Sequence, residues 1–161
     1  MKLFEKMNKI LKDNSLAESY ADCVIDDYKS MQIKINKLKE VMTKLSQARR
    51  KDQANNRIEL VKSLYRTLSY IENGFDEFEY NYIDLCHLII LHENMKLTPK
   101  INTKVSFAVN TKNELRKEFE TIYRNFKSMA KKLEDIPMKE ILSRMRIVFN
   151  ISNRLSLCTD I

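Results

Sequence analysis

Apolar residues recur every three or four positions over two long stretches of this chain. The first run spans residues 17–45 and the second spans residues 61–89, so each covers 29 residues. This spacing is that of the a and d positions of helices that hold one apolar seam against a neighbour. The two runs lie symmetrically about residue 53. We therefore expect an antiparallel helical hairpin in which Leu45 lies beside Val61 and Ala17 lies beside Ile89.

The two seams also predict the core. The first consists of Ala17, Ala21, Val24, Tyr28, Met31, Ile35, Leu38, Met42 and Leu45. The second consists of Val61, Leu64, Leu68, Ile71, Phe75, Phe78, Tyr82, Leu85 and Ile89. If Leu38 and Leu68 were exposed, the hairpin would be excluded.

Further helices complete an all-α fold. Residues 3–11 form an amphipathic pattern, which we expect to be a short helix folded onto its own bundle. Asp13-Asn14-Ser15 then interrupts it, and Ser15 with Glu18 matches the capping box of a new helix. The main helices are expected over residues 15–47, 57–93 and 113–133, and from Pro137 onward. The sequence thus predicts a single domain of residues 1–161: an antiparallel helical bundle built on a long helical hairpin, with four main helices plus a short N-terminal helix.

Two segments depart from the helical pattern. Gly74 costs about 1 kcal/mol relative to alanine inside a helix, but the seam stays in phase across it, so we expect a continuous helix. Residues 94–111 are less regular. Thr98-Pro99 suits an N-cap and a first helical turn, whereas Val105, Phe107 and Val109 alternate as in a strand. We expect a loop or a loosely formed helix that begins at Thr98.

Composition limits the class of protein. The chain has one Gly and two Pro among 161 residues, too few for a fold rich in turns. Its three cysteines show no CxxC spacing, which is typical of reduced thiols in a cytoplasmic protein. The longest apolar run, residues 88–91, is far short of a membrane span, and no secretory segment is evident, so no membrane association is expected. The content of Lys, Asn and Ile suits an AT-rich genome such as that of a phage or a low-GC bacterium.

No motif commits the chain to a reaction. His87 and His92 are five positions apart and do not share a helical face, so the HExxH zinc pattern is absent. Asp84 and His87 have the spacing of half a carboxylate-bridged metal site, but no second pair accompanies them. Cys86 and His87 point to different faces, and a single glycine excludes Gly-rich phosphate loops. We expect no catalytic residue, cofactor or metal; a metal-dependent helical enzyme is the least favoured hypothesis.

The densest acidic and aromatic patch lies in the middle of the second seam. Its carboxylates either pair with the basic C-terminal helices or belong to a partner-binding face, since exposed aromatic residues often anchor interfaces. The candidate partner-binding residues are Glu72, Asp76, Glu77, Glu79 and Tyr80. The favoured hypothesis is a non-enzymatic helical protein that binds another protein, as an adaptor or an inhibitor. Regular seams also permit a homodimer.

Charge is distributed unevenly along the chain. Residues 1–93 hold 15 Lys/Arg and 15 Asp/Glu, whereas residues 94–161 hold 14 against 7 and supply the whole net charge of +7. These cations are solvated, or they attract nucleic acid or an acidic protein surface. Non-specific nucleic-acid binding is the alternative function. No signature of a sequence-specific DNA or RNA reader accompanies them. The candidate nucleic-acid residues are Arg49, Arg50, Lys51, Lys112, Arg116, Lys127, Lys131, Arg144 and Arg146.

Overall fold

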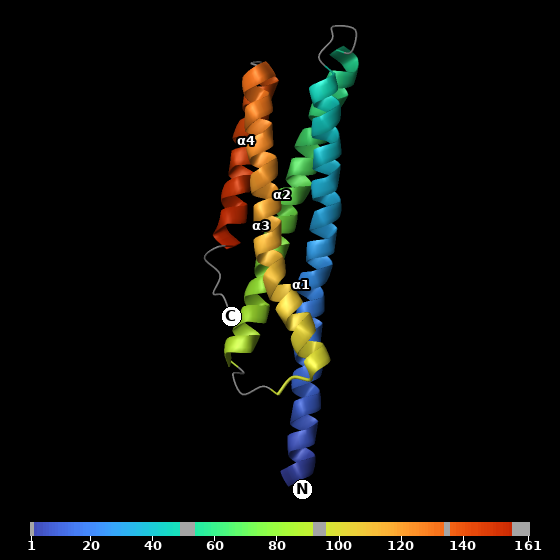
Figure 1. Cartoon of the computed structure of the whole chain (residues 1–161), viewed down its shortest axis with the longest axis vertical. Coiled ribbons are helices and arrows are strands. Elements are labelled where there is room, and N and C mark those ends of the chain that lie inside the picture. The colour runs from blue at the N-terminus through green and yellow to red at the C-terminus, as the bar shows by residue number, and fades with distance from the viewer. Residues whose placement is uncertain (1, 49–53, 92–95, 134–135, 156–161) are drawn as a thin grey trace.

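The computed structural model describes residues 2–48, 54–91, 96–133 and 136–155, and over these ranges the chain forms four helices and no strand. They are α1 (Lys2–Gln47), α2 (Ala54–Leu91), α3 (Pro99–Leu133) and α4 (Ile136–Arg154). The helices lie side by side and alternate in direction along the chain (Figure 1). The all-α prediction is confirmed. No stretch of the described helices combines the length and the hydropathy of a bilayer-crossing segment.

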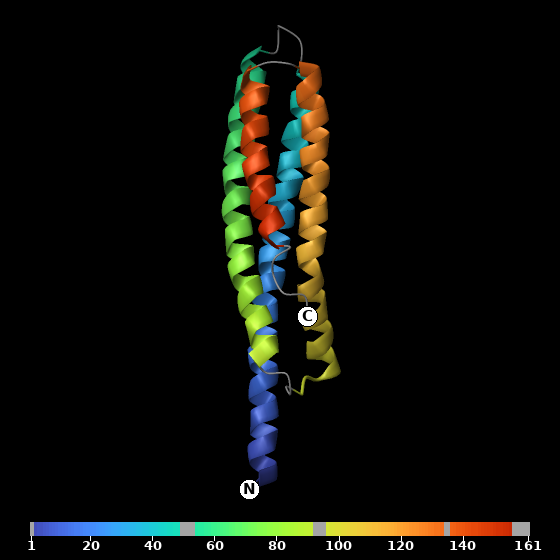
Figure 2. The ribbon, with the colours of Figure 1, turned by 90° about the vertical axis from the view of Figure 1, so that its left-hand side faces the viewer.

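Helices α2 and α3 occupy opposite corners of the bundle. α1 packs against α2 and α3, and α4 packs against the same two helices. α1 and α2, and likewise α3 and α4, are antiparallel neighbours, while α1 and α3, and likewise α2 and α4, are parallel neighbours (Figures 1 and 2). With only 19 residues, α4 covers the half of the bundle near the α1–α2 connection.

α1 and α2 pack against each other and run in opposite directions (Figures 1 and 2). Leu38 and Leu68 are fully buried, as are most of the other seam residues. A fold that is symmetric about residue 53 places Asp27 opposite position 79. In the structure the side-chain amide of Asn81, about two positions from 79, donates a 2.6 Å hydrogen bond to the Asp27 carboxylate. The core then continues across the bundle, where the rings of Phe75 and Phe119 meet edge to face with centroids 5.6 Å apart.

The N-terminal segment differs from the prediction, because α1 is continuous from Lys2 and no separate short helix exists. Asn14 does not break the helix. It is buried and donates hydrogen bonds to the carbonyls of Ile10 (2.8 Å) and Lys96 (2.9 Å), and its Oδ1 accepts one from the Thr98 amide (2.8 Å). The predicted capping box at Ser15 is wrong. Ser15 lies inside α1, where the backbone amides donate hydrogen bonds to carbonyls of the preceding turn.

Residues 2–13 of α1, which we call the N-terminal arm, do not fold onto the bundle. They extend beyond the ends of α2 and α3 in both views (Figures 1 and 2). The side chains of residues 2–9 are all exposed, and the first buried residue of α1 is Asn14. The expectation that this segment packs on its own bundle is therefore wrong.

Of the two alternatives expected for residues 94–111, the structure shows the helix and not the loop over residues 99–111, which form the first turns of α3. Ile101, Val105 and Ala108 are buried at helical spacing, so packing outweighs the low helix propensity of the neighbouring residues. The apparent strand alternation has no structural counterpart, because Phe107 is exposed. Thr98 caps the helix as predicted, and its hydroxyl accepts a 3.4 Å hydrogen bond from the Ile101 amide.

Gly74 on α2 lies directly against Met31 of α1. A Cβ atom at this position would overlap the sulfur of buried Met31 and lie 3.3 Å from Lys34 Nζ. We predict that Gly74→Ala lowers the free energy of unfolding by about 1 kcal/mol, because overpacking exceeds the gain in helix propensity. In a Met31→Ala background the same change should instead stabilise by about 1 kcal/mol. Urea unfolding followed by circular dichroism measures both effects, and equal stabilisation in the two backgrounds would contradict the prediction.

Asn14 joins α1 to the segment that enters α3. We predict that Asn14→Ala lowers the free energy of unfolding by about 1–3 kcal/mol, because the Thr98 amide and the Lys96 carbonyl lose their partner. Hydrogen exchange at the Thr98 amide should accelerate as well. Asn8→Ala, which changes an exposed asparagine of the arm, is the control for helix propensity alone. Unchanged exchange at Thr98 would show that Asn14 does not hold this connection.

Candidate functional site

Three acidic residues of α2, Glu72, Asp76 and Glu79, face α4. Glu72 accepts a hydrogen bond from Arg144, and Asp76 accepts one from Arg154 at 2.8 Å. Arg154 Nε also lies 3.3 Å from Glu79 Oε2, as an ion pair without hydrogen-bond geometry. For these three carboxylates, pairing with the basic C-terminal helix is the arrangement that the structure shows.

Glu77 and Tyr80 lie on the exposed side of α2. Tyr80 is 70% exposed, and Glu77 is also exposed. Glu77 lies near Asp27, whose carboxyl has a raised pKa: burial is the main cause, Glu77 and Asp26 add to it, and the hydrogen bond from Asn81 opposes it. Of the five candidate partner-binding residues, Asp76 is exposed as well but is paired with Arg154, whereas Glu72 and Glu79 are partly buried.

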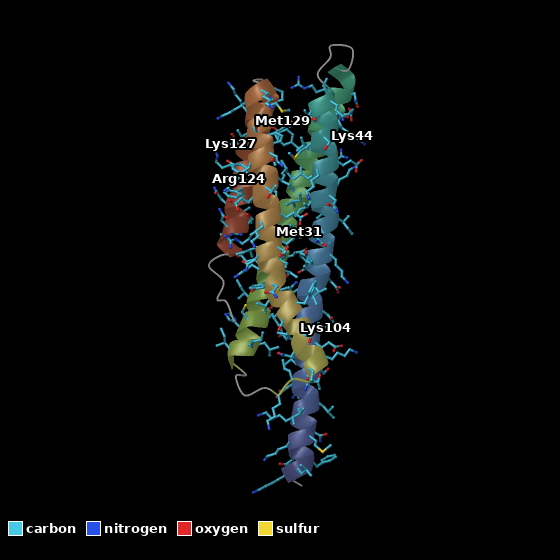
Figure 3. The ribbon with its side chains drawn as sticks, viewed as in Figure 1. Met31, Lys44, Lys104, Arg124, Lys127 and Met129 are labelled. Atoms are coloured by element: carbon cyan, nitrogen blue, oxygen red, sulfur yellow. The ribbon has the colours of Figure 1, made fainter. Side chains whose placement is uncertain are left out.

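Among the described side chains, every ion pair between different helices joins the first hairpin (α1 and α2) to the second hairpin (α3 and α4). Besides the contacts of α4, Lys39 lies 3.1 Å from Glu118, and Lys104 lies 3.0 Å from Asp22 and 3.7 Å from Glu18. The hydrogen bond to Asp22 raises the pKa of Lys104, which lies on the side of α3 that faces α1 (Figure 3). Together these inter-helix pairs occupy four cations, Lys39, Lys104, Arg144 and Arg154.

Two candidate nucleic-acid residues are not available on the surface. Lys112 is 1% exposed, and its Nζ lies 5.4 Å from the centroid of the Tyr82 ring, a cation–π contact within the core. Arg144 is engaged by Glu72. Arg49, Arg50 and Lys51 lie outside the described residues.

The remaining cations gather between α3 and α4. On α3, Arg116, Lys127 and Lys131 share a face with Tyr123, which stacks on Phe149 of α4 with centroids 4.7 Å apart. On α4, Lys139 and Arg146 share a face with Phe149, and Arg146 Nε lies 3.3 Å from the Tyr123 hydroxyl. We call this surface the α3–α4 groove. Figure 3 shows Lys127 and Arg124 on this side of α3.

A cavity of about 420 Å³ opens in the α3–α4 groove, lined by Ala130, Lys131, Lys139 and Leu142. The sequence predictions missed Lys139, although its spacing with Leu142, Arg146 and Phe149 was a usable signal. Another cavity, of about 360 Å³, lies between α1 and α3. Its one titratable lining residue, Lys39, is already bound to Glu118, and Met129 lies at its border (Figure 3).

The N-terminal arm presents an apolar stripe to solvent. Leu3, Phe4, Met7 and Leu11 are 72%, 68%, 55% and 67% exposed. Leu3 and Met7 continue the heptad spacing of the first seam toward the N-terminus, and Phe4 and Leu11 widen it. Lys2, Lys6, Lys9 and Lys12 lie on the remaining faces of the arm. Contiguous exposed apolar side chains of this kind are typical of interaction sites.

No reactive constellation is evident in the described part of the chain. His87 is exposed and Cys86 is buried, so the two neighbours do not form a dyad. The described side chains include no group of three His, Cys, Asp or Glu residues arranged to hold a metal ion; His92 lies outside the described residues. Comparison with protein-family models, curated proteins and solved structures finds no match for this chain.

The Glu72–Arg144 pair should couple more strongly than an exposed pair. Its side chains are 23% and 35% exposed, against 42% and 75% for Glu120 and Arg124. We predict that a double-mutant cycle of Glu72→Gln and Arg144→Gln gives a coupling of about 1 kcal/mol, while Glu120→Gln and Arg124→Gln give about 0.3 kcal/mol. Urea unfolding of the parent protein and of the single and double variants measures both couplings. Equal values would show that the α2–α4 pair is no better than a surface pair.

Proposed function

We propose that the chain is a non-enzymatic binding protein that engages another protein through the apolar stripe of its N-terminal arm. The supporting observation is that Leu3, Phe4, Met7 and Leu11 are more than half exposed on a helix that projects from the bundle. Side chains at i, i+4 and i+8 on one helical face are the anchors of the helix-in-groove mode of recognition. An adaptor or an inhibitor would use the arm in this way.

The direction of the stripe favours a protein over a lipid surface. The stripe continues the seam that packs on α2 and α3 farther along α1, with a drift of only about 20° per heptad. The apolar side chains therefore face the side of α1 on which the rest of the bundle lies. A flat bilayer approaching from that side meets the end of the bundle, whereas a helix or a groove can lie beside the arm.

The charge around the stripe indicates the character of the partner. Within residues 2–13 the arm carries four lysines against Glu5 and Asp13. An apolar groove with an acidic rim would therefore match both the stripe and its surroundings. Glu77 and Tyr80 form a separate exposed surface on α2, which would extend the contact only for a partner that reaches along the bundle.

Site-specific photo-crosslinking in cells that carry this gene tests the proposal. With benzoylphenylalanine in place of Met7, we predict a covalent adduct with one defined protein; at Lys9, on the opposite face of the arm, we predict none. Leu3→Ser combined with Leu11→Ser should abolish the adduct at position 7. The thermal unfolding of the isolated protein should remain unchanged, because both leucines are exposed.

Two outcomes would contradict the proposal. Adducts of equal yield at positions 7 and 9 would mean that the apolar stripe is not recognised. If position 7 formed an adduct only with a second copy of the chain, the arm would mediate a homodimer and would not bind another protein. The crosslink masses distinguish these cases.

A further inference from the structure

We infer that the α3–α4 groove binds the phosphate backbone of nucleic acids without reading their sequence. This surface is separate from the N-terminal arm, so the inference does not rest on the protein-binding proposal. Ion pairs within the folded chain determine which cations of α3 and α4 are already neutralised. α3 and α4 together carry 13 Lys/Arg and 4 Asp/Glu. Lys104, Arg144 and Arg154 are held by carboxylates of the first hairpin.

Cations without a carboxylate partner border both sides of the groove. Lys127 and Lys131 on α3, and Lys139 on α4, are exposed and make no ion pair with a described residue. Arg146 donates a hydrogen bond to the Tyr123 hydroxyl and forms no ion pair with a described carboxylate. Arg116 is half-buried on the same side of α3, and none of the described groups accepts a hydrogen bond from its Nε. Glu120 lies on this side too, but it is neutralised by Arg124 at 2.7 Å.

The dimensions of the groove suit a phosphate backbone. From Arg116 to Lys131 the α3 row extends about 22 Å along the helix. Each strand of a duplex places a charge about every 3.4 Å, so several phosphates lie within that length. The cavity of about 420 Å³ between Lys131 and Lys139 leaves room for a backbone between the two rows.

The composition of the groove favours nucleic acid over an acidic protein surface. Protein interfaces have an apolar centre with aromatic anchors. Here Tyr123 and Phe149 stack on each other and are partly buried, so neither ring is offered as an anchor. Phosphate binding requires clustered cations and little else, because counterion release supplies the free energy.

Fluorescence anisotropy with a labelled 20-nucleotide single strand, and with its duplex, tests the inference. We predict binding of both at 50 mM salt and a loss of about a hundredfold in affinity by 200 mM, as for four phosphate contacts. Lys131→Gln combined with Lys139→Gln should lower the slope of log K against log salt by about 2. Lys29→Gln combined with Lys37→Gln removes the same charge from α1, at the corner opposite α4, and should leave the slope unchanged.

Three results would overturn the inference: no anisotropy change at 50 mM salt, equal weakening by both pairs of substitutions, or tighter binding of polyglutamate than of either nucleic acid. The second result would mean that net charge alone attracts the strand. The third would assign the groove to an acidic protein. All four substituted lysines are exposed, so circular dichroism should show unchanged helix content in every variant.

Discussion

The apolar seam of α1 is the constraint on which the rest of this structure depends. It is buried against α2 along one flank and against α3 along the other, and α4 completes the bundle only by packing on those two helices. Because the seam runs in phase from the arm to Leu45, α1 remains a single helix of 46 residues. The free length of α1 beyond the bundle is what exposes the apolar stripe.

Electrostatic contacts give the two hairpins their relative placement. The inter-helix ion pairs among the described residues connect carboxylates and amines of α1–α2 with their counterparts on α3–α4. Partly exposed pairs of this kind contribute little free energy individually, but they oppose slippage of one hairpin along the other. They also determine which cations remain for binding, since the groove consists of those that the first hairpin does not reach.

Sequence reasoning identified the hairpin because heptad spacing alone encodes a shared apolar face. It placed Asp27 within about two positions of its contact in α2. It left residues 99–111 open between a loop and a helix, because local propensity and alternation pointed away from a helix, and burial of Ile101, Val105 and Ala108 decided the outcome. It failed at the arm, because an amphipathic pattern does not tell whether the apolar face is covered.

The candidate sites were predictable in part. The pairing of Glu72 and Asp76 with α4 followed from the complementary charges of the two regions. The burial of Lys112 was missed, although this lysine stands in the same seam as Val105, Ala108 and Leu115, where its stem packs and its amine meets Tyr82. Lys139 was missed because it directly follows Met138, inside the apolar pattern of α4, and its proximity to Lys131 on α3 becomes apparent only in three dimensions.

The diagonal placement of α2 and α3 has a consequence for the order in which the molecule assembles. Each hairpin closes through a short connection, so its two helices meet before the two hairpins can. During synthesis, the electrically balanced N-terminal hairpin emerges first and can present its carboxylates as a template. The C-terminal hairpin carries an excess of positive charge, part of which these carboxylates offset when it docks. The uneven distribution of charge along the chain thus favours assembly of the basic half on the neutral half.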